Sequence, residues 1–227
     1  MDLQSYLDLI LNIRSKEFSE FKELLLESNK KYNLTSICGE KEVIYKHFLD
    51  SIAGESYFPL NSKVAEIGSG GGFPSVPLMI VREDLKFTLI ESTGKKCGFL
   101  REAVNKLNLN CEQVLNIRAE DGARDKNLRE SFGVVCARAV ARLNTLAEYC
   151  LPYCAVGGRF IAYKGECAEE IDEAQRAVKL LGGEIEEVVK YELFENFGKR
   201  TLVVIRKVKS TPQIYPRGLG KERKNPL

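Results

Sequence analysis

The chain has few of the residues that bind transition metals or build disulfide frameworks. Its 227 residues include one histidine, His47, and seven cysteines, none of them in a C-x-x-C pair. Zinc sites need such histidine and cysteine spacing, and an odd number of scattered cysteines is not typical of a disulfide framework. We therefore expect neither a metal centre nor a disulfide-stabilised secreted fold.

Strong net charge and long hydrophobic runs are absent as well. The 34 Lys and Arg residues nearly balance the 32 Asp and Glu residues, so charge alone does not indicate a polyanionic partner. The N-terminal segment MDLQSYLDLILNIRS has no basic run before its apolar residues, and Asp8 interrupts them. This is typical of neither a signal peptide nor a membrane span, so we expect a cytoplasmic protein without membrane attachment.

The chain does contain a regular alternation of short β-rich segments with helical ones. Its length and its 44% hydrophobic residues allow one sizeable core with a modest extension. Apolar residues recur at helical spacing in the first part of the chain, and from Val64 onward strands alternate with helices. Such alternation predicts a parallel sheet covered on both faces. The predicted strands are residues 64–67, 87–90, 113–117, 134–137 and 160–163, and the predicted helices are 95–107, 143–153 and 167–181.

The alternation ends after Gly182 and Gly183. Residues 184–193 and 201–208, joined through 194–198, predict a closing antiparallel hairpin. The whole pattern is the layout of an α/β, Rossmann-like class I methyltransferase fold. That fold has a mainly parallel seven-stranded sheet with a C-terminal antiparallel hairpin, and here it carries an N-terminal helical extension.

The stretch VAEIGSGGGFP, residues 64–74, runs the first predicted strand into a glycine-rich turn. Parallel strands end at the edge of the sheet where open α/β folds bind ligands, and glycines let a ligand approach backbone N–H groups. Gly68, Gly70 and Gly72 form G-x-G-x-G, whereas a dinucleotide fingerprint needs a glycine at position 73, which is Phe73. No G-K-[ST] follows at P-loop spacing. A tight turn without a ligand is the alternative.

Two carboxylates near this turn favour a cationic ligand. Glu66 stands just before the turn, where its charge disfavours a diphosphate and favours the sulfonium of S-adenosylmethionine. Glu91 ends the next predicted strand, 91 − 68 = 23 positions after Gly68. That is close to the roughly 20 positions expected for a carboxylate that holds ribose hydroxyls. For Glu91, a helix N-terminal charge is the alternative.

Several segments of the chain match one known family in order and spacing. They are KYNLTSI, KHFLDSI, EIGSGGGFPSVPLMIV, FTLIESTGKKCGFLREAV, NIRAED, VCARAVARLNTLAEYCLP, IAYKG and TPQIYPRGLGKERKNPL. Over nearly its whole length the sequence resembles the RsmG (GidB) family of bacterial 16S rRNA guanine-N7 methyltransferases. The resemblance implies S-adenosylmethionine as cofactor and 16S rRNA or the small ribosomal subunit as partner, with no obligate protein partner.

The pattern along the chain indicates a division into three parts, and the resemblance implies a set of cofactor-binding residues. We expect a helical extension at residues 1–60, an S-adenosylmethionine-binding methyltransferase domain at 61–209 and a basic tail at 210–227. Arg138 would reach the methionine carboxylate or a substrate oxygen, and a place in a salt bridge is its alternative, as a place beside the helix N-cap is for Glu120. With Gly70 and Glu91 from the argument on the glycine turn, the expected cofactor-binding residues are Gly68, Gly70, Phe73, Glu91, Ala119, Glu120 and Arg138.

Methyl transfer to guanine N7 agrees with the absence of an identifiable general base and of motifs typical of other methyl acceptors. N7 has an exposed lone pair, so no proton must be removed before attack, and positioning and desolvation can carry most of the catalysis. Residues 136–139 read CARA, without the [DN]-P-P-[YF] pattern typical of exocyclic amine methylation. Cys136 is favoured as a buried strand cysteine over a nucleophile. No catalytic residue is assigned, and Arg138 and Lys164 are the candidates.

Several roles stay open. Lys164 could contact rRNA or extend to solvent, and His47 and Asp50 could line the site or cap and pack a helix. The basic segment from Arg200 to Lys224 is the candidate RNA-binding region, with Tyr215 able to stack on a base, and a solvated tail is the alternative.

Two other functions also remain. A ribose 2′-O-methyltransferase would use a lysine-centred base such as Lys164 next to a carboxylate, and a non-catalytic RNA-binding protein would keep the fold alone. An NAD-dependent oxidoreductase is disfavoured by the turn and by Glu66.

Overall fold

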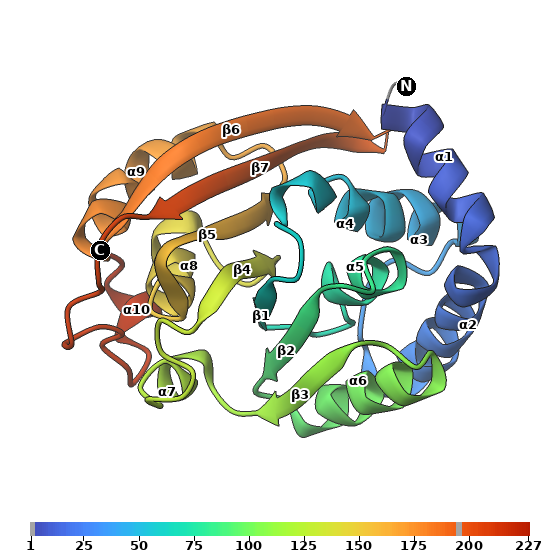
Figure 1. The fold of residues 1–227 in the computed structure, drawn as a ribbon, viewed down its shortest axis with the longest axis horizontal. Helices are drawn as coiled ribbons and strands as arrows, with labels where there is room; N and C mark the ends of the chain where they lie inside the picture. Colours follow the sequence, from blue (N-terminus) through green and yellow to red (C-terminus); the bar gives the residue numbers. More distant parts are fainter. Residues whose placement is uncertain (1–2, 194–196) are drawn as a thin grey trace.

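The computed structural model describes residues 3–193 and 197–227, and it contains a seven-stranded sheet with the order β3-β2-β1-β4-β5-β7-β6 (Figure 1). Strand β7 is antiparallel to both of its neighbours, and the other pairs are parallel. The predicted sheet and its closing hairpin are confirmed, while residues 194–196 of the predicted connection lie outside the described residues. The strands are β1 (Lys63–Ile67), β2 (Lys86–Glu91), β3 (Cys111–Asn116), β4 (Phe132–Arg138), β5 (Cys154–Lys164), β6 (Gly183–Leu193) and β7 (Gly198–Lys207).

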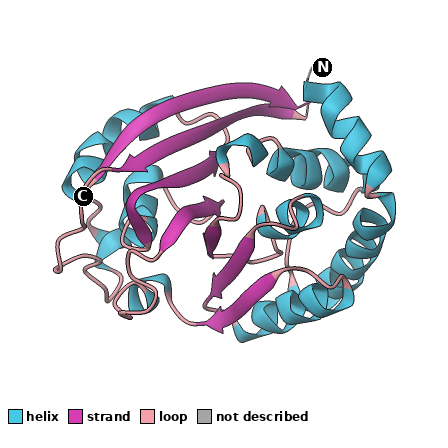
Figure 2. Cartoon of the chain, in the orientation of Figure 1, coloured by secondary structure: helices cyan, strands magenta, loops and turns pink. Residues whose placement is uncertain are grey.

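Helices flank this sheet on both sides, as Figure 2 shows. The helical N-terminal part and the three predicted helices between the strands are present. Within the described residues, no helix is both long and apolar enough to cross a membrane. The helices are α1 (Leu3–Ile13), α2 (Ser15–Tyr32), α3 (Glu40–Val43), the π-helix η1 (Ile44–Leu49), α4 (Asp50–Ile52), the 3-10 helix η2 (Glu55–Tyr57), α5 (Ser75–Val81), α6 (Gly94–Lys106), α7 (Ala119–Gly122), α8 (Leu143–Cys150), α9 (Ala168–Leu180) and α10 (Lys221–Lys224).

The central strands are apolar on both faces, because helices cover both. Successive side chains of a strand point to opposite faces, so Val64 joins the core under α2, α5 and α6, while Ala65 joins the core under α8 and α9. Cys136 lies in the first of these cores and is fully buried, which confirms the structural interpretation of that cysteine. Burial raises its pKa well above the ordinary value, so it is not poised as a thiolate.

Aromatic side chains tie the N-terminal helices to the glycine turn. Phe21 of α2 packs on Phe73 with ring centroids 5.5 Å apart, and Phe48 of η1 lies 5.1 Å from Phe18 and 6.3 Å from Phe73. All four rings are buried. Such contacts fix η1 over the turn, and η1 carries His47 next to Phe48.

The C-terminal tail is fastened to the fold at several points. The Glu148 carboxylate of α8 is fully buried and accepts hydrogen bonds from the backbone N, Nε and Nη2 of Arg217. Arg129 donates to the carbonyl oxygens of Thr211 and Tyr215. Tyr215 is 9% exposed within the core under α8, so the expectation that it could stack on a base is wrong.

Candidate functional site

A cavity of about 500 Å³ opens where the strand order reverses. Strand β1 is flanked by β2 on one side and β4 on the other, and the connections leave these strands in opposite directions. Ligands of open α/β sheets bind at such a switch point, outside the carboxyl ends of the strands. The cavity is lined by the loops after α2, β1, β4 and β5, by η1 and by residues of α4, α6, α9 and β7. Its lining includes Leu34, Thr35, Lys46, His47, Asp50, Gly68, Gly70, Phe73, Lys96, Arg138, Lys164 and Arg200.

The glycine turn after β1 forms the floor of this cavity. Gly68 and Gly70 have φ angles of +72° and +51°, a backbone conformation that side chains with a Cβ disfavour. The Gly68 N–H donates to Ile90 O at 2.8 Å, and the Gly70 N–H donates to Glu91 Oε2 at 3.0 Å. A Cβ on Gly68 would meet Val140 Cγ2 at 2.6 Å, while among the described residues a Cβ on Gly70 would meet only Gly68 O, at 3.7 Å. The turn therefore leaves open space above Gly70.

Glu66 supports the turn from below and does not line the cavity. Its side chain is fully buried, its Oε2 accepts from the Ser75 hydroxyl at 2.5 Å, and its Oε1 has no partner among the described residues. Burial raises the pKa of Glu66 to about 7, and the hydrogen bonds of Ser75 and Ser69 only partly oppose this. The direct charge contact with a ligand that we expected from the sequence is not what the structure has.

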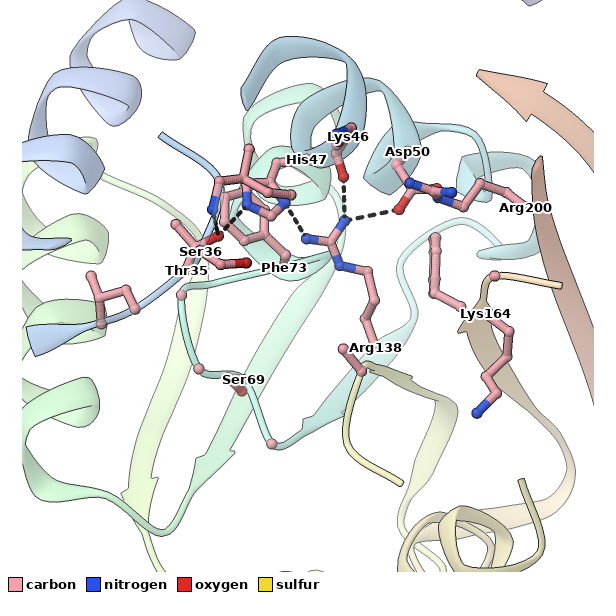
Figure 3. Close-up of a pocket in the computed structure, with 18 of the residues that line it drawn as sticks. Thr35, Ser36, Lys46, His47, Asp50, Ser69, Phe73, Arg138, Lys164 and Arg200 are labelled. Atoms are coloured by element: carbon pink, nitrogen blue, oxygen red, sulfur yellow. Dashed lines mark hydrogen bonds and ion pairs between the residues drawn. The ribbon is translucent and has the colours of Figure 1, made fainter. Parts of the chain in front are cut away.

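Arg138, at the end of β4, reaches across the cavity to η1 (Figure 3). Its Nη1 donates to Asp50 Oδ2 at 2.9 Å and to Lys46 O at 3.1 Å, and its guanidinium lies 4.9 Å from the centre of the Phe73 ring. Its Nη2 lies 2.5 Å from His47 Nδ1. The guanidinium is thus fixed in one orientation before any ligand binds.

Asp50 is the anionic centre of this group. Its carboxylate is buried, and Oδ1 accepts from the Tyr191 hydroxyl at 2.7 Å and lies 3.5 Å from Arg200 Nε. It is therefore shared by cations from β4 and β7 and by a hydroxyl from β6. Buried carboxylates are tolerated when they are paired in this way.

Lys164, at the end of β5, neither extends to solvent nor stays free for a ligand. Its Nζ forms an ion pair with Glu170 Oε2 at 2.6 Å and donates to Ala141 O at 2.9 Å. The side chain is 11% exposed and lines the cavity. This arrangement ties the loop after β4 to α9 and places a cation at the rim.

The structure gathers most, but not all, of the residues expected at the site. Gly68, Gly70, Phe73, Arg138 and Lys164 line the cavity, together with His47 and Asp50. Three others lie at the same edge of the sheet but do not line the cavity. Glu91, at the end of β2, has Oε2 on the turn and Oε1 accepting from Thr93 N at 2.7 Å, and Ala119 and Glu120 begin α7 after β3.

Sequence reasoning missed several lining residues. Thr35 and Lys46 come from loops or helices of the N-terminal part, Lys96 comes from the first turn of α6, and Arg200 comes from β7. Thr35 lies within KYNLTSI and Lys46 within KHFLDSI, so the matched segments carried a signal for both. Local pattern alone says nothing about Arg200, because its place depends on how the hairpin crosses the site.

The sheet and its flanking helices form the fold of a class of solved proteins, the S-adenosylmethionine-dependent methyltransferases. A solved SAM dependent methyltransferase from Aquifex aeolicus has the same fold, with a TM-score of 0.55 at 18% identity over 75% of this chain and 94% of that one. The sequence narrows this class to one family. Residues 14–201 match the model of the GidB family, rRNA small subunit methyltransferase G, and the chain belongs to that family.

Named relatives of the chain agree with the family match. Ribosomal RNA small subunit methyltransferase G of Pelotomaculum thermopropionicum is 46% identical over 215 residues, which cover 93% of this chain and 90% of the relative. The protein of the same name from Brevibacillus brevis is 45% identical over 221 residues, covering 96% and 93%. The resemblance inferred from the motifs is therefore confirmed over most of the chain.

Proposed function

We propose that this protein transfers a methyl group from S-adenosylmethionine to N7 of a guanine in 16S rRNA. The family match over residues 14–201 carries this proposal. The cavity at the switch point supports it, because an open space above a glycine turn suits a nucleoside cofactor. The small ribosomal subunit or its rRNA is the partner, and the cytoplasm, where that partner is found, is the expected location.

The residues present fit S-adenosylmethionine. The position above Gly70 is open, Phe73 offers an apolar ring, and Arg138 offers a cation for the methionine carboxylate. Among the described hydrogen bonds of Arg138, Nη1 and Nη2 are used toward η1, which leaves Nε and one Nη2 proton for a carboxylate. Glu91 and the backbone around Ala119 and Glu120 lie outside the cavity at the same edge of the sheet, and there they would hold the ribose and the adenine.

When bound, the cofactor supplies a methyl group already activated on a sulfonium. The protein then has to hold the guanine with its N7 lone pair toward that methyl, exclude water, and supply cations for the RNA phosphates. It needs no general base, since N7 has no proton to lose. This agrees with the engagement of the Lys164 ammonium by Glu170 and Ala141.

The test is incubation with methyl-labelled S-adenosylmethionine and small subunits, or their rRNA, that lack the modification. Nucleoside analysis of the product separates the three functions left open by the sequence. Label in 7-methylguanosine supports the proposal, and label on a ribose supports the 2′-O-methyltransferase. Absence of label despite measured cofactor binding supports a non-catalytic RNA-binding protein.

A further inference from the structure

His47 has a place at the site that the transfer reaction itself does not require. It stands on η1, is 6% exposed, and stacks on Phe73 with ring centroids 4.2 Å apart and an interplanar angle of 17°. Its two ring nitrogens have different partners. Nδ1 faces Arg138 Nη2 at 2.5 Å, and Nε2 faces Thr35 Oγ1 at 2.8 Å (Figure 3).

The partners determine which nitrogen carries the proton. A guanidinium only donates hydrogen bonds, so the nitrogen facing Arg138 has to accept, and His47 is neutral with its proton on Nε2. That proton is donated to Thr35 Oγ1, which also accepts from Ile37 N at 3.0 Å. Thr35 thereby favours the tautomer that Arg138 needs.

The burial of the His47 ring and the charges around it also favour its neutral form. Burial, and after it the charges of Arg138, of Arg200 on β7 and of the neighbouring Lys46, together lower the pKa of His47 to about 3. The Lys46 backbone opposes this only in part. A protonated ring would place two cations in contact, so the neutral ring is the one that fits beside Arg138.

We propose that His47 is a positioning residue, which holds the Arg138 guanidinium, as a neutral acceptor, in the orientation that receives the carboxylate of the cofactor. Asp50 and Lys46 O hold one end of the guanidinium, and His47 holds the other. The edge that remains is the one with Nε and the second Nη2 proton. This inference rests on the proposed function, because it concerns the same cofactor.

The chain offers a direct test, because His47 is its only histidine. In a 15N-labelled protein without ligand, the imidazole signals therefore need no assignment. We expect a neutral ring with the proton on Nε2, unchanged from neutral pH down to about pH 5. A ring that titrates near its ordinary pKa, or one protonated on Nδ1, overturns the proposal. This result does not depend on methyl transfer, so it stays separate from the test of the function.

Three substitutions test the consequence for binding. His47→Asn keeps an acceptor at the position of Nδ1, His47→Gln places its amide near that of Nε2, and His47→Phe keeps only the stacked ring. The ligands are S-adenosylhomocysteine and 5′-methylthioadenosine, which lacks the amino-acid group. We expect the Gln and Phe variants to bind S-adenosylhomocysteine roughly tenfold more weakly, the loss of one charge-assisted hydrogen bond, and the Asn variant to bind it nearly as the wild type does.

The second ligand separates positioning from packing. All three variants should bind 5′-methylthioadenosine nearly as the wild type does, because Arg138 does not contact that ligand in this arrangement. Thermal unfolding of each variant establishes that it is folded. Equal weakening of both ligands in all three variants, or no weakening of either, contradicts the proposal.

Discussion

Gly68→Ala and Gly70→Ala should differ in their effects. Gly68→Ala should cause the larger loss of stability, whereas Gly70→Ala should mainly weaken cofactor binding. Both positions have positive φ, and placing alanine there costs about 1–2 kcal/mol. At Gly68 the new Cβ also meets Val140 Cγ2 at 2.6 Å, and overpacking of this kind adds about 1–3 kcal/mol. At Gly70 the neighbour that a Cβ would meet, within the part of the chain that the structure describes, is Gly68 O at 3.7 Å. Gly68→Ala is therefore expected to lower the free energy of unfolding by about 2–5 kcal/mol, and Gly70→Ala by about 1–2.

Thermal unfolding without ligand measures the loss of stability, and for a chain of this size the melting temperature should fall by about 2–4 °C per kcal/mol. Calorimetric titration with S-adenosylmethionine measures cofactor affinity. Gly70→Ala should lose most of that affinity although it remains folded, because its new methyl group enters the cavity. Val140→Ala is the control: combined with Gly68→Ala it removes the close contact, and the pair should be less destabilised than the sum of the single changes. Wild-type affinity in Gly70→Ala would refute the placement of the cofactor above the turn.

Three further predictions concern the charges that hold the site and the tail. Asp50→Ala leaves the Arg138 guanidinium without its anion, although only 12% of that side chain is exposed. We expect urea titration to show a loss of about 3–5 kcal/mol in the free energy of unfolding. A loss below about 1 kcal/mol would show that the pair is not buried in solution. Glu148→Ala removes the carboxylate that accepts hydrogen bonds from Arg217, so limited proteolysis should cut residues 211–227 before the rest of the chain. Resistance equal to that of the wild type would contradict a role of Glu148 in holding the tail. Burial raises the pKa of Glu66 from its ordinary value of 4.5 to about 7, so the folded state binds a proton more tightly than the unfolded state, and stability should fall as pH rises from about 4.5 through 7. Glu66→Gln should flatten that pH profile of stability, and an unchanged slope would assign the profile to other groups.

The sequence allowed the sheet, its closing hairpin and the location of the cavity to be predicted. Hydrophobic periodicity and the glycine turn are local signals, and the rules for parallel sheets place Gly68 and Arg138 at one edge. The partners of Arg138 were beyond such reasoning. His47 and Asp50 lie 91 and 88 positions away from it, and contact depends on how η1 packs over the turn.

Burial of polar residues was the second limit of the prediction. Glu side chains are almost never fully buried and Tyr side chains are buried to an intermediate degree on average, yet both Glu66 and Tyr215 are buried here. For Glu66 the reason is Ser75, which lies nine positions later and donates to the carboxylate. For Tyr215 the reason is the way in which Arg129 and Glu148 hold the tail against the fold. Contacts of this kind join different helices and strands, so they produce no periodic pattern in the sequence from which they could be predicted.

The chemistry of the product gives the most direct test of the proposed function. Methylation of N7 places a positive charge on the guanine ring, which makes that nucleotide sensitive to borohydride reduction and cleavage of the chain by aniline. After reaction with S-adenosylmethionine, 16S rRNA should be cleaved at one additional guanine, and omission of the enzyme or the cofactor should abolish that cleavage. Methyl incorporation into the rRNA without any new cleavage would contradict N7 as the acceptor.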